Sequence, residues 1–127
     1  MSEKDTIALL DELARAANWH VESYEQRRAS KICRGLPDRR YVNRQRLTRV
    51  WVEAKTPGGK LTETQHRWLL DELYGEGLAT VIDDVSQLAR LFNILAGPRV
   101  GRLEEARAYC LELVRLTAQR GYRREAA

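Results

Sequence analysis

The sequence predicts an α/β domain with a mixed sheet, in the order αβββαβα, followed by one further helix. Three observations lead to this prediction. Apolar residues recur at helical spacing near both ends of the chain. In the middle, apolar residues alternate with polar ones on both sides of a polar turn, as in a hairpin of strands. A compact apolar run after two glycines has the length and character of a buried strand.

The N-terminal half is expected to contain one helix and three strands. Ser2 followed by Asp5 resembles a capping box, which marks the start of the first helix. The polar stretch Asn43-Arg-Gln-Arg46 suits the turn between the second and third strands. The expected elements are a helix at residues 3–17 and strands at residues 19–24, 38–43 and 49–55.

The C-terminal half begins after Thr56-Pro-Gly-Gly59, a strong chain breaker, and Thr62 is a good N-cap for the next helix. The expected elements are helices at residues 62–74, 85–95 and 103–120 and a strand at residues 78–82. We assign residues 1–96 to the main domain and residues 97–127 to a helical extension that packs on it. The apolar stripe of this last helix must cover its own domain or a second subunit, and we favour a second subunit.

The composition is that of a soluble globular protein, because 43% of the residues are hydrophobic and 31% are charged. No stretch approaches the roughly 20 apolar residues of a membrane span. The N-terminus carries acidic residues where a signal peptide carries basic ones. Cys33 and Cys110 form no CxxC pair, so we expect reduced thiols and no zinc, in a cytoplasmic protein.

Positive charge is concentrated between residues 27 and 49. This segment has nine basic residues and one acidic residue, Asp38, an excess of eight positive charges in a chain whose net charge is +4. Such a local field on an otherwise acidic protein indicates a polyanion partner, and we expect nucleic acid. The residues that we expect to contact it are Arg27, Arg28, Lys31, Arg34, Arg39 and Arg40, with Lys60 from the glycine loop.

The third strand carries the candidate chemistry. Alternate residues of a strand share a face, so Glu53 and Lys55 point the same way. Asp38 begins the preceding strand and can approach Glu53 across the hairpin. Two carboxylates beside a lysine can hold a cation that prefers oxygen ligands, such as Mg²⁺ or Mn²⁺. A single Glu-x-Lys is common as a surface ion pair, so this tripeptide alone is weak evidence.

Four short motifs follow one another closely: Gly35-Leu-Pro-Asp38, Val52-Glu-Ala-Lys55, Pro57-Gly-Gly-Lys-Leu61 and Gln65-His-Arg-Trp68. Together they resemble the virus-type replication-repair nucleases (VRR-NUC), a branch of the PD-(D/E)xK superfamily, over residues 3–92. The resemblance implies a restriction-endonuclease-like core. It differs in two respects. The family usually places apolar residues after the PD aspartate, whereas Arg39 and Arg40 follow here, and the loop before Gly35 is rich in arginine.

The resemblance also implies roles for individual residues. Asp38 matches the PD aspartate, Glu53 and Lys55 match the (D/E)xK pair, and Gln65 matches a supporting glutamine on the next helix. The backbone carbonyl of Ala54 is expected to complete the coordination of the metal.

Members of the family commonly add a carboxylate from the first helix. Glu3 fits best by its distance from the first strand. Asp5, Asp11 and Glu12 are competitors for this role.

The expected function is a Mg²⁺- or Mn²⁺-dependent, structure-selective DNA endonuclease. It would act as a homodimer on four-way junctions or flaps in phage replication and repair. The alternatives are a non-catalytic nucleic-acid-binding module with the same fold and a structural assembly protein. His20 and His66 are expected to be structural, and Trp51 is the tryptophan that we consider for stacking on a base, because it shares a face with Glu53.

Overall fold

A computed structural model describes residues 1–24 and 34–125. Within these residues the element order is that predicted, αβββαβα with a final helix. The cysteine at position 33 and the basic residues Arg27, Arg28 and Lys31 lie outside the described residues. The elements are α1 (Glu3–Ala16), β1 (His20–Ser23), β2 (Arg39–Asn43), β3 (Thr48–Ala54), α2 (Glu63–Tyr74), β4 (Ala79–Ile82), α3 (Val85–Leu95) and α4 (Arg102–Ala118).

Side-chain caps fix the starts of α1 and α2, and the sequence indicated the N-cap residue of each, Ser2 and Thr62. Ser2 and Asp5 form a reciprocal capping box at the start of α1, and Thr62 and Gln65 form one at the start of α2. None of the helices in residues 1–24 and 34–125 is long and apolar enough to cross a membrane.

The four described strands form one mixed sheet in the order β1-β2-β3-β4. β1, β2 and β3 are antiparallel neighbours, whereas β4 lies parallel to β3. In the β2–β3 pair, Arg39 lies opposite Val52 and Arg40 lies opposite Trp51. The prediction of a mixed sheet is confirmed.

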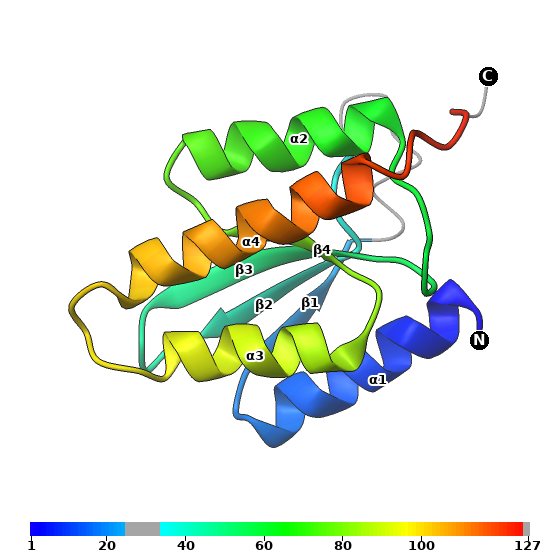
Figure 1. Ribbon diagram of the computed structural model, residues 1–127. Coiled ribbons are helices and arrows are strands. Elements are labelled where there is room, and N and C mark those ends of the chain that lie inside the picture. The colour runs from blue at the N-terminus through cyan, green and yellow to red at the C-terminus, as the bar shows by residue number, and fades with distance from the viewer. Residues whose placement is uncertain (25–33, 126–127) are drawn as a thin grey trace.

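Helices cover both faces of the sheet (Figure 1). α2 lies on one face, α1 and α3 lie on the other, and α4 runs along β4 between α2 and α3. Because strand side chains alternate, Val50 and Val52 point toward α1 and α3, while Trp51 and Glu53 point toward α2. The candidate site therefore lies on the face of the sheet that α2 covers.

The apolar stripe of α4 covers its own domain rather than a second subunit, which corrects our expectation. β4 is at the edge of the sheet and all four of its residues are buried, so this strand needs a cover. α4 supplies it, and Thr80 on β4 donates a hydrogen bond to the carbonyl of Cys110 on α4. Burial raises the pKa of the Cys110 thiol to about 12, so this thiol is protonated at neutral pH.

Candidate active site

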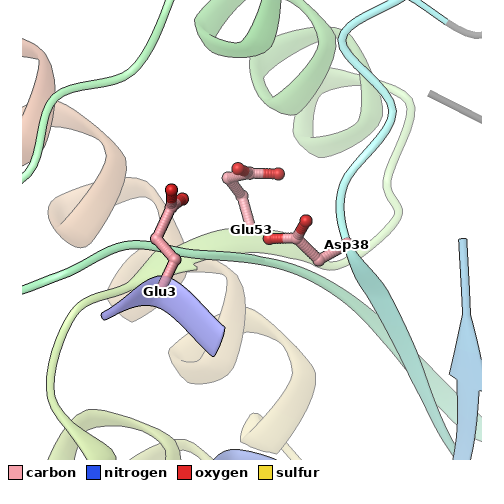
Figure 2. A group of neighbouring side chains, drawn as sticks. All are labelled: Glu3, Asp38 and Glu53. Carbon is pink, nitrogen blue, oxygen red and sulfur yellow. The ribbon is translucent and has the colours of Figure 1, made fainter. Parts of the chain in front are cut away.

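Three carboxylates from three separate elements converge at one end of the sheet (Figure 2). Glu3 belongs to the first turn of α1, Asp38 immediately precedes β2, and Glu53 lies near the end of β3. One oxygen from each lies within 4.8 Å of the others. The competitors of Glu3 are engaged elsewhere or point away: Asp5 caps α1, Asp11 is buried against Arg39, and Glu12 is exposed.

Asp38 is held by the strand that carries its partner. Its Oδ2 accepts a hydrogen bond from the backbone N–H of Ala54 at 2.9 Å. The register places Asp38 opposite Glu53, one step beyond the Arg39–Val52 pair. The convergence that the hairpin predicted is therefore confirmed. The expected role of the Ala54 carbonyl stays a prediction.

Gly35 brings the Asp38 loop close to α2. Its φ is +83°, which disfavours any residue with a Cβ. A Cβ at this position would lie 2.8 Å from the backbone oxygen of Thr64 in the first turn of α2. The glycine of the Gly35-Leu-Pro-Asp38 motif thus permits the loop and the helix to make contact beside the site.

Lys55 shares the site with Glu53, as the alternation of the strand predicted. Its side chain is 2% exposed, and its Nζ lies 3.3 Å from Glu53 Oε2 and 3.6 Å from Glu3 Oε1. This buried Nζ makes no hydrogen bond with the described residues. Gly59 packs against the base of the Lys55 side chain, because a Cβ on Gly59 would lie 3.0 Å from the Cβ of Lys55. The second glycine of the Pro57-Gly-Gly59 loop therefore lets the chain fold back over the lysine.

Gln65 links the start of α2 to the carboxylates. Its Oε1 accepts from the backbone N–H of Thr62 at 3.0 Å, and its Nε2 donates to Glu53 Oε2 at 3.1 Å. The first bond occupies the amide oxygen, so the amide nitrogen is directed to the carboxylate. The helix cap and the orientation of Glu53 thus depend on one side chain.

The electrostatics of the cluster favour a bound cation. With the carboxylates ionised, Glu3, Asp38 and Glu53 together with Lys55 carry a formal charge of −2. Two carboxylate charges about 5 Å apart repel each other by roughly 3 kcal/mol at an effective dielectric constant of 20. Lys55 can offset one of the three carboxylates. A divalent cation bound between the oxygens would offset the other two, and all-oxygen ligands suit Mg²⁺ or Mn²⁺.

Arg39 is part of the fold rather than of an exposed basic surface. Its Nε donates to both carboxylate oxygens of Asp11, at 3.1 and 3.2 Å, and its side chain is 11% exposed. Tyr41 donates to the same carboxylate at 2.8 Å. Burial and the Asp11 charge raise the pKa of Tyr41, so its hydroxyl stays protonated. We therefore no longer include Arg39 among the nucleic-acid contacts, since its guanidinium is needed on the α1 side of the sheet.

The other predicted basic contacts differ in their surroundings. Arg40 is half-buried, pairs with Glu22 and lies over the rings of Tyr24 and Trp51. Trp51 packs against these groups and against Trp68 of α2, so it is part of an aromatic cluster. Arg34 and Lys60 are exposed, in the loops that lead to Asp38 and away from Lys55.

The C-terminal tail, residues 119–125, places one residue, Arg123, beside the carboxylates, and the sequence analysis did not identify it. Arg123 Nη1 lies 4.0 Å from Glu3 Oε2. Tyr122 contacts His66, whose Nδ1 lies 2.7 Å from the tyrosine hydroxyl, and burial lowers the pKa of this histidine. The cluster of arginines at positions 120, 123 and 124 was the signal in the sequence that could have drawn attention to the tail.

The chain matches no family model, no curated protein and no solved structure. The resemblance to VRR-NUC nucleases therefore stays a prediction.

Proposed function

We propose that this protein is a metal-dependent nuclease that hydrolyses phosphodiester bonds in DNA, with a centre formed by Glu3, Asp38, Glu53 and Lys55. One observation carries the proposal. Oxygens of three carboxylates from distant parts of the chain lie within 4.8 Å of one another, with the Lys55 ammonium 3.3 Å from one of them. Burying such a group costs stability, and a role for the charges at the site accounts for that cost.

The donor set fits a hard divalent cation. Glu3, Asp38 and Glu53 would hold Mg²⁺ or Mn²⁺, with the Ala54 carbonyl as a further ligand implied by the family resemblance. Such a cation, when bound, polarises a phosphate and makes an attacking water more acidic. Asp38 and Glu53 are buried, so their geometry is fixed by the fold, whereas Glu3 is half-buried and lies at the solvent side of the cluster.

The remaining polar groups have separate tasks. Lys55 would stabilise negative charge that develops on the phosphate, or orient the attacking water, because its ammonium is directed at the carboxylates from a buried position. Gln65 would keep the Glu53 carboxylate in one orientation through the 3.1 Å hydrogen bond from its Nε2. Both roles depend on positions that α2 and β3 set before substrate binds.

The choice of DNA as substrate is supported by charge and by the family resemblance. The segment between residues 27 and 49 has an excess of eight positive charges around Asp38, although Arg39 and Arg40 pair with Asp11 and Glu22. Contacts to phosphate position a nucleic acid without reading its sequence, so we propose structure-selective cleavage of branched or flapped DNA. A PD-(D/E)xK core of the VRR-NUC type and a homodimeric assembly belong to the same proposal.

The direct test is cleavage of labelled junction, flap and linear duplex DNA with Mg²⁺, with Mn²⁺ and with a chelator. We expect cleavage of the branched substrates that chelator abolishes and that Glu53→Gln reduces by roughly 100-fold or more. Glu104→Gln is the matched control, because it removes the same charge from an exposed position on α4. Cleavage by the Glu53→Gln protein at the wild-type rate would show that the activity comes from elsewhere.

Lys55→Met separates metal binding from catalysis. It removes the ammonium and keeps most of the side-chain volume. Calorimetric titration with Mn²⁺ should show affinity equal to or higher than that of the wild type, because a repelling positive charge has gone. Cleavage should nevertheless be lost. Loss of metal binding together with cleavage would contradict the role that we assign to this lysine.

The same assays test the alternatives and the assembly. Binding of branched DNA without cleavage under any of the metal conditions would favour a non-catalytic binding module. An absence of both binding and cleavage would exclude both nucleic-acid functions. Sedimentation equilibrium tests the homodimer: a mass near 14.7 kDa at micromolar concentration would show a monomer and overturn that part of the proposal.

A further inference from the structure

The chain after α4 returns to the site along the loop that follows Lys55. Figure 1 shows this segment passing the N-terminal end of α2 before the chain ends. The backbone N–H of Arg123 donates to the carbonyl of Leu61 at 2.7 Å. Before it, Arg120 Nη1 donates to the carbonyl of Gly59 at 3.1 Å and to Asp83 at 2.8 Å. The tail is thus fixed on the loop from its beginning.

Contacts on both sides of Arg123 hold its backbone in place. On one side, the hydroxyl of Tyr122 lies 2.7 Å from His66 Nδ1 on α2. On the other, the Glu125 carboxylate accepts hydrogen bonds from the backbone N–H and the hydroxyl of Thr64, in the first turn of α2. These two bonds lower the pKa of Glu125, so it is ionised at neutral pH. None of these contacts uses the Arg123 guanidinium.

The Arg123 guanidinium lies beside the carboxylate cluster and is open to solvent. Its side chain is 52% exposed, and its Nη1 is 4.0 Å from Glu3 Oε2, while the other oxygen of Glu3 is 3.6 Å from Lys55 Nζ. Glu3 therefore lies between a buried cation and an exposed one. An ion pair this long and this exposed adds little to stability. The tail does not need this pair to stay in place, so the guanidinium can exchange Glu3 for another anion.

We propose that Arg123 is a substrate-binding residue, and that its guanidinium contacts a backbone phosphate of DNA next to the carboxylate cluster. The proposal rests on the proposed nuclease function. Arginine suits this contact because its planar guanidinium can donate two parallel hydrogen bonds to one phosphate. When Glu3 binds a cation, its attraction for Arg123 falls, and a phosphate on the same side becomes the better partner. Arg123, from the C-terminal tail, is then part of the active site.

The test compares Arg123→Ala with Arg124→Ala, a neighbouring exposed arginine that carries the same charge. Fluorescence anisotropy of a fluorescein-labelled flap DNA with Ca²⁺ measures binding separately from turnover. We expect Arg123→Ala to weaken binding about tenfold and to reduce the slope of log Kd against log salt by about 1. Arg124→Ala should leave both within about twofold of the wild type. Arg123→Lys should recover only part of the affinity, because lysine lacks the planar pair of donors.

Cleavage measured on the same proteins with Mg²⁺ or Mn²⁺ distinguishes failure of this inference from failure of the proposed function. If the wild type cleaves and Arg123→Ala binds and cleaves like Arg124→Ala, the role of Arg123 is overturned and the nuclease stands. If Arg123→Ala binds DNA more tightly or cleaves faster, the tail blocks the site, and the proposal is also overturned. If the wild type binds DNA without cleaving it, the proposed nuclease function is wrong. The anisotropy measurements then still show whether Arg123 contacts the DNA.

Discussion

The Asp38 carboxylate accepts a hydrogen bond from the backbone N–H of Ala54, at 2.9 Å, in the strand that carries Glu53 and Lys55. This bond joins two of the predicted motifs by a side-chain-to-backbone contact. Asp38 therefore has a structural role besides its proposed role as a metal ligand, because it supplies the acceptor for the N–H of the fully buried Ala54. The two roles can be separated by substitution.

Asp38→Ala should lower the free energy of unfolding by about 1–3 kcal/mol, because it leaves the buried N–H of Ala54 without its acceptor. Asp38→Asn keeps an oxygen at that position and should cost less than about 1 kcal/mol. Both variants should lose most of the cleavage activity, since neither supplies a carboxylate. Urea unfolding without metal and a DNA cleavage assay measure the two effects. Equal destabilisation by the two variants would show that the hydrogen bond is not what Asp38 contributes to stability.

Asp11 and Glu3 differ in what their removal should change, although both were candidates for the carboxylate from α1. Asp11→Ala removes the carboxylate that pairs with the buried Arg39 guanidinium and should lower the free energy of unfolding by about 3 kcal/mol or more. It should leave the Mn²⁺ affinity of the folded protein unchanged. Glu3→Gln should have the reverse effect, with weaker Mn²⁺ binding and little change in the unfolding midpoint. Glu12→Ala, at an exposed neighbouring position, should alter stability by less than about 0.5 kcal/mol.

Gly35 and Gly58 form a matched pair for testing the contact between the Asp38 loop and α2. Both have positive φ, +83° and +75°, but a Cβ at Gly58 meets nothing within 4 Å, whereas one at Gly35 meets the Thr64 backbone. Alanine at either position should therefore lower the free energy of unfolding by about 1–2 kcal/mol, because of the positive φ. At Gly35 the contact with Thr64 should lower it by about 1–3 kcal/mol more. Gly35→Ala should also reduce cleavage, because Asp38 lies three residues further on. Equal unfolding midpoints for the two variants would contradict the close contact.

The Glu22 carboxyl should give the stability a dependence on pH in the acid range. The hydrogen bond from Arg40 holds the pKa of Glu22 below its usual 4.5. A carboxyl whose pKa is lowered by folding stabilises the protein above the unfolded pKa, and this contribution is lost as the pH falls through the folded pKa. NMR titration of the Glu22 side-chain carbon should show the lowered pKa in the wild type. In Arg40→Ala it should return toward 4.5, and an unchanged value there would exclude Arg40 as the cause.

Much of the fold could be predicted from the sequence, because its signals are local. Ser2 with Asp5 forms the predicted capping box, and Thr62 is the predicted N-cap, so the starts of α1 and α2 were visible in the chain itself. The alternation in β3 placed Glu53 and Lys55 on one face without knowledge of any other strand. The hairpin then brought Asp38 near them, given the register that the structure has.

Tertiary structure decided the features that depend on contacts between distant segments. The choice of Glu3 over Asp11 follows from how α1 crosses the sheet, which places Asp11 against Arg39, 28 residues away. The same contact removed Arg39 from the predicted basic surface, since charge in a sequence does not show whether an ion pair will bury it. The sequence showed the apolar stripe of α4 and the strand β4, but it did not show that the two pack against each other. Arg123 and Glu3 are 120 positions apart in the sequence, and no local pattern encodes a contact over that separation.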